Sequence, residues 1–235
     1  MSNNKLENID GHYWMPVNKK SNQKQPMNKL EYLEALVAEA NTDIGKHGYL
    51  PTFAEHLPDK CRSMIEIGIA YGGSAEVWDS FYGFEELDLH YIDLFQNPEF
   101  VSPRWCRNRG FVPHIGSQAD IHFLSTIKEQ FEVAVDDGSH VAAHMIASFK
   151  HLFVNNLVSG GVYFITDCHC NKEEFYWGEG VTCFEDTPLW VMKNYLETGR
   201  IESKFFNEGE SEIFQNLIKS VHICCDEKII VIKKK

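Results

Sequence analysis

No apolar run of this sequence is long enough to cross a membrane. Its 235 residues contain no stretch near the ~20 apolar residues of a transmembrane helix, and residues 1–5 lack a signal-peptide core. Acidic residues outnumber basic ones by 34 to 22, which gives a net charge of −12 and disfavours a nucleic-acid partner. We therefore expect a soluble, cytoplasmic protein with no nucleic-acid or membrane partner.

Paired cysteines at metal-binding spacing are also absent. The seven cysteines are an odd number, scattered through a chain too long to depend on disulfide bonds, so we expect reduced thiols. Cys168-His169-Cys170 lacks the C-x₂-C spacing and the second pair of a zinc site. Buried thiols are the expected role of these cysteines.

The composition is that of one globular domain, since 43% of residues are hydrophobic and no repeat is visible. Residues 1–26 are polar around an aromatic island at 12–15, so we expect a disordered tail or a flap that closes over the active site. Residues 27–235 are expected to form the catalytic domain. The homo-oligomeric state stays open.

Apolar runs alternate with amphipathic segments along most of the chain. Strands are predicted at 62–67, 87–94, 110–115, 131–135 and 161–165, and a closing hairpin at 220–225 and 228–232. Helices are predicted at 28–41, 51–57, 75–82, 119–130, 140–156 and 187–198. This order indicates an α/β protein with a mostly parallel sheet.

A glycine-rich turn follows the first of these strands and opens a helix. The spacing, from Glu66 through Gly68 to Gly72-Gly73, is E-x-G-x-x-x-G-G, which differs from the G-x-G-x-x-G of dinucleotide-binding proteins and makes NAD the poorer candidate. Glycines let the backbone approach a ligand, although such turns also serve packing alone. The stretch resembles the first motif of class I S-adenosylmethionine (SAM) methyltransferases, which implies cofactor contacts from Glu66, Gly68, Tyr71 and Ser74.

Acidic residues stand at the ends of four of the five predicted parallel strands, and these ends share one rim in a parallel sheet. They are Glu66, Asp93, the pair Asp136 and Asp137, and Asp167. Asp93 lies at the ~20-residue distance from the glycine turn that is typical of a ribose-binding acid, with a helix or loop cap as the alternative.

A polar pair lies at a further strand end. Ser117 and Gln118 follow the strand predicted at 110–115 and could hydrogen-bond an adenine edge. Capping of a helix is the alternative for Ser117.

The run Asp136-Asp137-Gly138-Ser139-His140 carries a more specific resemblance. Together with 66–74, 116–120, 160–169 and 220–235, it resembles the metal-dependent sugar O-methyltransferases of macrolide tailoring, of the mycinamicin and tylosin type, over roughly residues 62–235. The resemblance implies a Rossmann-like class I methyltransferase fold with seven strands, parallel except for the last. It also implies SAM as the methyl donor, Mg²⁺ or another divalent cation as cofactor, and a sugar-containing acceptor.

The same resemblance implies roles for individual residues. Asp137 and Asp167 would hold the metal, His140 would be the general base, and Asp136 would lie at the cofactor. The family often has Glu-Asp where this chain has Thr166-Asp167, which predicts a weakly held cation. Carboxylates suit Mg²⁺, and a histidine titrates where it can accept a hydroxyl proton near neutral pH.

Other functions are compatible with parts of this pattern. A metal-independent O-methyltransferase of another small molecule and a catalytically degenerate SAM-binding protein are the main alternatives. His140 and His144 are spaced i, i+4 like a zinc-binding pair, but the H-E-x-x-H glutamate is absent. The long aromatic segment 168–186 is expected to form a wall for the acceptor.

Overall fold

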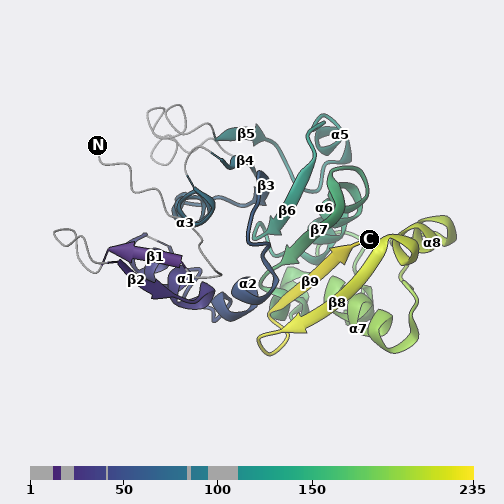
Figure 1. Ribbon diagram of the computed structural model, residues 1–235. Helices are drawn as coiled ribbons and strands as arrows, with labels where there is room; N and C mark the ends of the chain where they lie inside the picture. Colours follow the sequence, from purple (N-terminus) through teal and green to yellow (C-terminus); the bar gives the residue numbers. More distant parts are fainter. Residues whose placement is uncertain (1–12, 17–23, 41, 84–85, 95–110) are drawn as a thin grey trace.

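The computed structural model describes residues 13–16, 24–40, 42–83, 86–94 and 111–235. Most of the predicted tail, residues 1–12 and 17–23, lies outside the described residues. Within it, β1 (Tyr13–Pro16) and β2 (Lys24–Met27) pair as a small antiparallel hairpin beside the first helix (Figure 1). No helix in the described ranges combines the length and apolarity needed to cross a membrane.

A seven-stranded sheet forms the centre of the domain (Figure 1). Its spatial order is β5-β4-β3-β6-β7-β9-β8. The strands are β3 (Ser63–Ile67), β4 (Asp88–Asp93), β5 (Val112–Ile115), β6 (Phe131–Asp136), β7 (Leu157–Ile165), β8 (Ile218–Cys224) and β9 (Ile229–Lys234). In this sheet β9 runs opposite to the other six strands, which confirms the predicted Rossmann-like topology with a reversed last strand.

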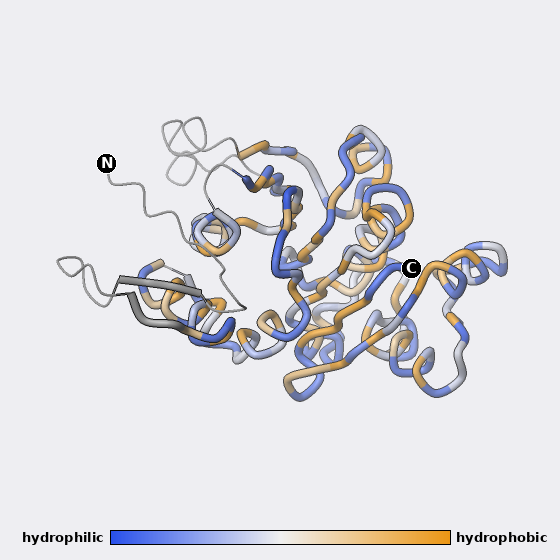
Figure 2. Tube along the Cα trace, viewed as in Figure 1, coloured by the Kyte–Doolittle hydropathy of each residue, from blue (hydrophilic) through white to orange (hydrophobic). Residues whose placement is uncertain are grey.

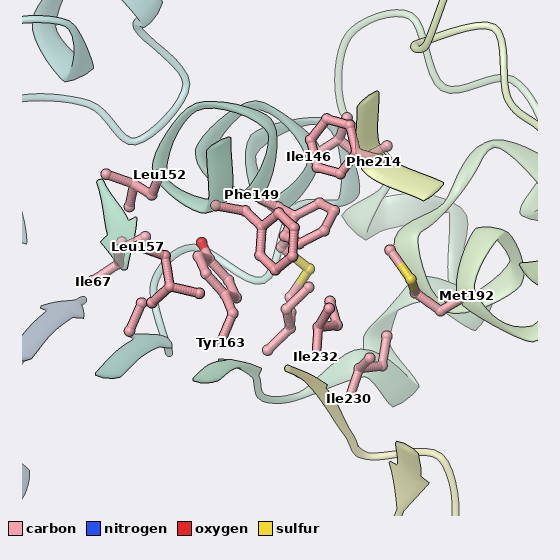
Figure 3. Close-up of a cluster of buried hydrophobic side chains, with 14 of the residues drawn as sticks. Ile67, Ile146, Phe149, Leu152, Leu157, Tyr163, Met192, Phe214, Ile230 and Ile232 are labelled. Atoms are coloured by element: carbon pink, nitrogen blue, oxygen red, sulfur yellow. The ribbon is translucent and has the colours of Figure 1, made fainter. Parts of the chain in front are cut away.

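Helices cover both faces of the sheet, so the central strands are apolar on both sides. One face packs on α1 (Lys29–Glu39), α2 (Leu50–His56) and α3 (Gly73–Tyr82), around Tyr32, Phe53 and Trp78. The other packs on α5 (Ile121–Leu124), α6 (Ala142–Asn155), α7 (Pro188–Thr198) and α8 (Glu208–Leu217). Figure 3 shows Phe149, Tyr163 and Phe214 within this second core.

Local signals explain where the helices begin. Asn28 caps α1 reciprocally: its side chain accepts from Glu31 N at 3.0 Å, and its own N–H donates to Glu31 Oε2 at 2.8 Å. Apolar and polar residues alternate along the flanking helices, as amphipathic packing on a sheet requires (Figure 2).

Two predicted helices differ from the structure. The helix expected at 119–130 is only the single turn α5, because the hydroxyls of Ser125 and Thr126 bond back to the carbonyls of His122 and Phe123. The helix expected to begin at His140 begins instead at Ala142, because His140 has a left-handed backbone (φ +58°) that a helix does not accommodate.

Candidate functional site

A cavity of about 920 Å³ opens at the carboxyl ends of the parallel strands. It is lined by the loops that follow β3, β4, β5, β6 and β7 and by residues 42–49, which precede α2. Ligands of open α/β sheets bind at this rim. The predicted site residues on its wall are Gly68, Tyr71, Ser74, Asp93, Ser117, Gln118, Asp137, His140 and Asp167.

The glycine turn is shaped by its contact with the next loop. Gly68 has φ +80°, and a Cβ there would lie 2.2 Å from the carbonyl oxygen of Asp137. Gly68 is therefore required for the approach of two protein loops, in addition to any ligand. Tyr71, at the tip of the turn, is 76% exposed on the cavity wall.

Glu66 does not reach the cavity. Its side chain is fully buried on the α3 face of the sheet and accepts from Ser74 Oγ at 3.0 Å and Trp78 Nε1 at 3.2 Å. Burial, aided by the charge of Asp137, raises its pKa to about 8. In the structure, Glu66 supports the glycine turn through Ser74, and its contact with the methionine end of SAM, direct or through water, stays a prediction.

Asp93 lies where a ribose-binding acid was predicted. It ends β4, lines the cavity and is half-buried. Its Oδ2 accepts from Ile69 N at 3.1 Å, so the carboxylate also fixes the glycine turn. Both roles are compatible because a carboxylate has about four acceptor sites.

Gln118 lies on the cavity wall, and its predicted adenine contact stays a prediction. Gln118 is buried, donates to Asp136 Oδ1 at 3.0 Å and accepts from Ser139 N at 2.8 Å, so its amide is committed to the protein. Ser117 accepts from Ala119 N at 3.2 Å and lines the cavity as a turn residue. Neither residue caps α5, which is capped by Asp120.

Asp136 is likewise buried beneath the site. It accepts from Ser148 and Gln118 on the α6 face of the sheet, and burial raises its pKa to about 6. It is absent from the cavity wall, and its predicted place at the cofactor stays a prediction. Its hydrogen bonds instead hold the loop that carries Asp137.

Asp137, His140 and Asp167 come together on the cavity wall. One ligand atom from each lies within 4.8 Å of the others. Thr166 donates from Oγ1 to Asp137 Oδ1, and burial still raises the pKa of Asp137. His140 Nε2 lies 3.7 Å from Asp167 Oδ2.

This group fits a divalent cation. Two carboxylates supply hard oxygen ligands, with a threonine hydroxyl beside them. His140 Nδ1 is buried and has no hydrogen-bond partner among the described residues, which indicates that a polar group is missing next to this ring. His140 and Asp167 both have left-handed backbones, at φ +58° and +50°, and such strain is concentrated at functional sites.

His144 does not form a zinc pair with His140. It lines the cavity but lies outside the acidic group, and its Nδ1 is 2.9 Å from Ser139 Oγ. This hydrogen bond gives His144 a role in holding the loop 137–140.

Tyr49 is a site residue that the sequence did not reveal. It is buried at the start of α2 and donates to Asp167 Oδ1 at 2.7 Å, while His47 stacks on its ring. Residues 42–47 complete this wall of the cavity. No local pattern marks Tyr49, because its partner lies in the distant loop after β7.

The aromatic segment after β7 folds into three short 3₁₀ helices, η1 (Cys168–Lys172), η2 (Glu174–Tyr176) and η3 (Phe184–Asp186). Tyr176 lines the cavity and Phe175 beside it is 86% exposed. Trp177 donates to Asn171 O at 2.9 Å, which fixes the segment to the body of the domain.

Comparison with known proteins identifies similar enzymes, although no family model matches the chain. L-olivosyl-oleandolide 3-O-methyltransferase of Streptomyces antibioticus is 27% identical over 199 residues, which cover 78% of this chain and 48% of that enzyme. Mycinamicin VI 2''-O-methyltransferase of Micromonospora griseorubida is 29% identical over 140 residues, which cover 52% of this chain and 31% of that enzyme. Among solved structures, the MycE methyltransferase in complex with Mg, SAH and mycinamycin VI aligns with a TM-score of 0.67 and 22% identity, over 86% of this chain and 54% of that one.

The chain has the class I methyltransferase fold and resembles the macrolide sugar O-methyltransferases. It spans less than half the length of the curated relatives that it matches. A further relative is a tetracenomycin rhamnosyl 3'-O-methyltransferase of Streptomyces olivaceus, which is 31% identical over 167 residues. These residues cover 64% of this chain and 40% of that enzyme.

Proposed function

We propose that this protein transfers the methyl group of SAM to a hydroxyl of a sugar. The acceptor class comprises nucleotide-linked sugars, polysaccharide units and glycosylated natural products. The observation that carries the proposal is the group Asp137, His140 and Asp167, which lies on one cavity with the glycine turn and Asp93.

The donor side of the cavity is formed by the turn after β3 and the end of β4. The backbone of residues 68–74 would face the methionine part of SAM, and Asp93 would accept hydrogen bonds from the ribose hydroxyls. Because Gln118 is committed to Asp136, we assign it a positioning role.

The acceptor side is formed by His140 and the two acids. Bound Mg²⁺ would lower the proton affinity of the acceptor hydroxyl. His140 Nε2 would receive the hydroxyl proton, and Asp167, 3.7 Å away, would stabilise the charged ring. Asp137 and Asp167 would hold the cation, and Tyr176 offers an apolar face to the sugar.

Residues 27–235 would form this catalytic domain, and residues 1–26 would form a tail or a flap. The hairpin of β1 and β2 lies beside α1. The loop that follows α1 contributes residues 42–49 to the cavity.

The experiment is methyl transfer from labelled SAM to a panel of nucleotide sugars and glycosylated natural products, with Mg²⁺ and with EDTA. We expect Mg²⁺-dependent transfer, and a loss of ~10²–10⁴-fold in turnover for His140→Ala with SAM affinity unchanged. His151→Ala is the matched control, since that residue of α6 lies outside the cavity wall. Normal turnover of His140→Ala would refute the mechanism.

Donor binding is tested separately by calorimetry with SAM. Asp93→Asn should weaken binding by about 1–3 kcal/mol, the cost of a disrupted buried hydrogen bond. Asp137→Asn and Asp167→Asn should retain SAM affinity and lose the response to Mg²⁺. Absence of SAM binding to the wild-type protein at millimolar donor would exclude methyl transfer altogether.

A metal-independent transfer is the second candidate, and Thr166 favours it. Its side chain is 1% exposed and donates to Asp136 O at 3.1 Å, so this position supplies no carboxylate to the cavity. Activity that resists EDTA but requires His140 would select this mechanism.

A further inference from the structure

Two histidines on the outer strands of the sheet face each other, away from the cavity. His90 lies in β4 and is 3% exposed, and His114 lies in the edge strand β5 (Figure 1). The register pairs Ile92 with His114, so the two histidines are diagonal neighbours on one face. Glu129, in the turn between α5 and β6, completes the group.

The three side chains direct their donor atoms toward one another. His90 Nδ1 and His114 Nε2 are hydrogen-bonded at 2.8 Å, and one ligand atom from each of the three residues lies within 4.8 Å of the others. None of the three residues lines the cavity, so the group is separate from the proposed active site.

A fourth residue orients the buried ring. Asp88 Oδ2 lies 3.2 Å from His90 Nε2, the nitrogen that points away from His114. A carboxylate at this position holds the proton on Nε2 and leaves the Nδ1 lone pair directed toward His114 and Glu129. Histidines that bind metals almost always have such a partner on the second nitrogen.

We propose that His90, His114 and Glu129 form a second metal site, selective for Zn²⁺ or a similar transition-metal ion over Mg²⁺. Two imidazoles and one carboxylate form a donor set typical of zinc, and water would take the fourth position.

The observed spacing requires only a small adjustment. Tetrahedral zinc with bonds of 2.0–2.1 Å holds two nitrogens roughly 3.3 Å apart. The two nitrogens, which are hydrogen-bonded at 2.8 Å, would separate by about 0.5 Å, and the rings would turn so that both lone pairs point at the ion. His114 can supply this movement because it is only half-buried on the edge strand.

A metal here would connect β4, β5 and the turn before β6, three elements that lead to the proposed active site. β4 ends at Asp93, three residues after His90, β5 leads to Ser117, and β6 leads to Asp137. The ion would thus cross-link the outer strands β4 and β5 to the start of β6. None of its three ligands lines the cavity, so the ion would take no part in methyl transfer.

The test measures Zn²⁺ and Co²⁺ binding to the full chain after EDTA treatment and dialysis. Asp137→Asn/Asp167→Asn serves as the background, so that the acidic site does not contribute. We expect one equivalent of Zn²⁺ by calorimetry and the visible absorption of tetrahedral Co²⁺. Zn²⁺ should also raise the melting temperature.

Variants locate the bound ion without disturbing the buried ring. His114→Ala should abolish this equivalent, Glu129→Gln should weaken it, and Asp88→Asn should weaken it by roughly 10–100-fold. His122→Ala, an exposed histidine of nearby α5, is the control and should bind normally. The same stoichiometry and affinity in His114→Ala and Glu129→Gln, both folded by circular dichroism, would overturn the proposal, as would absence of binding at micromolar Zn²⁺.

Discussion

The hydroxyl of Tyr49 donates a hydrogen bond to Oδ1 of Asp167 across 2.7 Å, and so joins residues 118 positions apart in the chain. The same hydroxyl accepts from the backbone N–H of Asp167 at 3.3 Å. Asp167 has a left-handed backbone, which for a non-glycine residue needs such external support. Tyr49 therefore fixes both the conformation and the side-chain direction of a proposed metal ligand.

Tyr49→Phe should weaken the Mg²⁺ response without unfolding the protein. The loss of a hydrogen bond to a charged group costs about 1.5–3 kcal/mol, so the Mg²⁺ concentration for half-maximal activity should rise by roughly one to two orders of magnitude. SAM affinity should not change. Activity measured against Mg²⁺ concentration, together with calorimetry for SAM, checks this prediction.

Tyr32→Phe is the matched control. Tyr32 is also fully buried, but its hydroxyl donates to Ser80 O at 3.1 Å, far from the acids. This variant should lose some stability and keep the wild-type Mg²⁺ dependence. Equal Mg²⁺ dependence in the two variants would show that Tyr49 has no special role at Asp167.

The sheet could be predicted because its strands are apolar runs bounded by clear turns. The β3 run ends in a glycine turn and the β6 run ends at Asp136-Asp137-Gly138, so both strands were located within a residue or two. Helix α8 was not predicted, since its ten residues include few apolar side chains, of which only Phe214 is buried. The short α5 was overestimated because the hydroxyl bonds that end it are not evident from hydrophobic periodicity.

The strand ends with acids could also be predicted, but not the direction of each side chain. Along a strand, successive side chains point to opposite faces. Glu66 therefore points toward α3 and Asp136 toward α6, whereas Asp137, one residue beyond β6, reaches the cavity. The choice between adjacent acids depends on where the strand stops, which is the least certain feature of a sequence-based prediction.

Glu66 should make the stability of the protein depend on pH. Its native pKa of about 8 is above the ordinary value of 4.5, so the folded protein keeps a proton that the unfolded chain releases. The free energy of unfolding should therefore fall as the pH rises from about 4.5 to 8 and level off above that range. Urea denaturation at several pH values measures this slope, which should amount to on the order of a few kcal/mol.

Glu66→Gln isolates this contribution. Glutamine is neutral at every pH and nearly isosteric with the protonated acid, so the decline assigned to Glu66 should disappear. Asp136, whose pKa is raised to about 6, gives a decline of the same sign that both proteins retain. Identical slopes in the two proteins would mean that Glu66 is ionised in the fold and that another group compensates its charge.

Gly68→Ala should be more destabilising than left-handed strain alone explains. At φ +80° a Cβ costs about 1–2 kcal/mol, and here it would also lie 2.2 Å from the Asp137 carbonyl and 2.7 Å from the Gly138 Cα. Both obstacles are backbone atoms, so the loop that carries Asp137 and His140 must move. The variant should therefore lose stability and Mg²⁺-dependent activity together.

Gly199→Ala separates the left-handed backbone strain from the clash of an added Cβ with neighbouring backbone. Gly199 has φ +72° at the end of α7, and a Cβ there would meet nothing within 4 Å. This variant should show only the strain of about 1–2 kcal/mol in urea denaturation, with the activity unchanged. If Gly68→Ala were no less stable than Gly199→Ala and equally active, the loops after β3 and β6 would not be in the close contact that places Asp137 on the cavity wall.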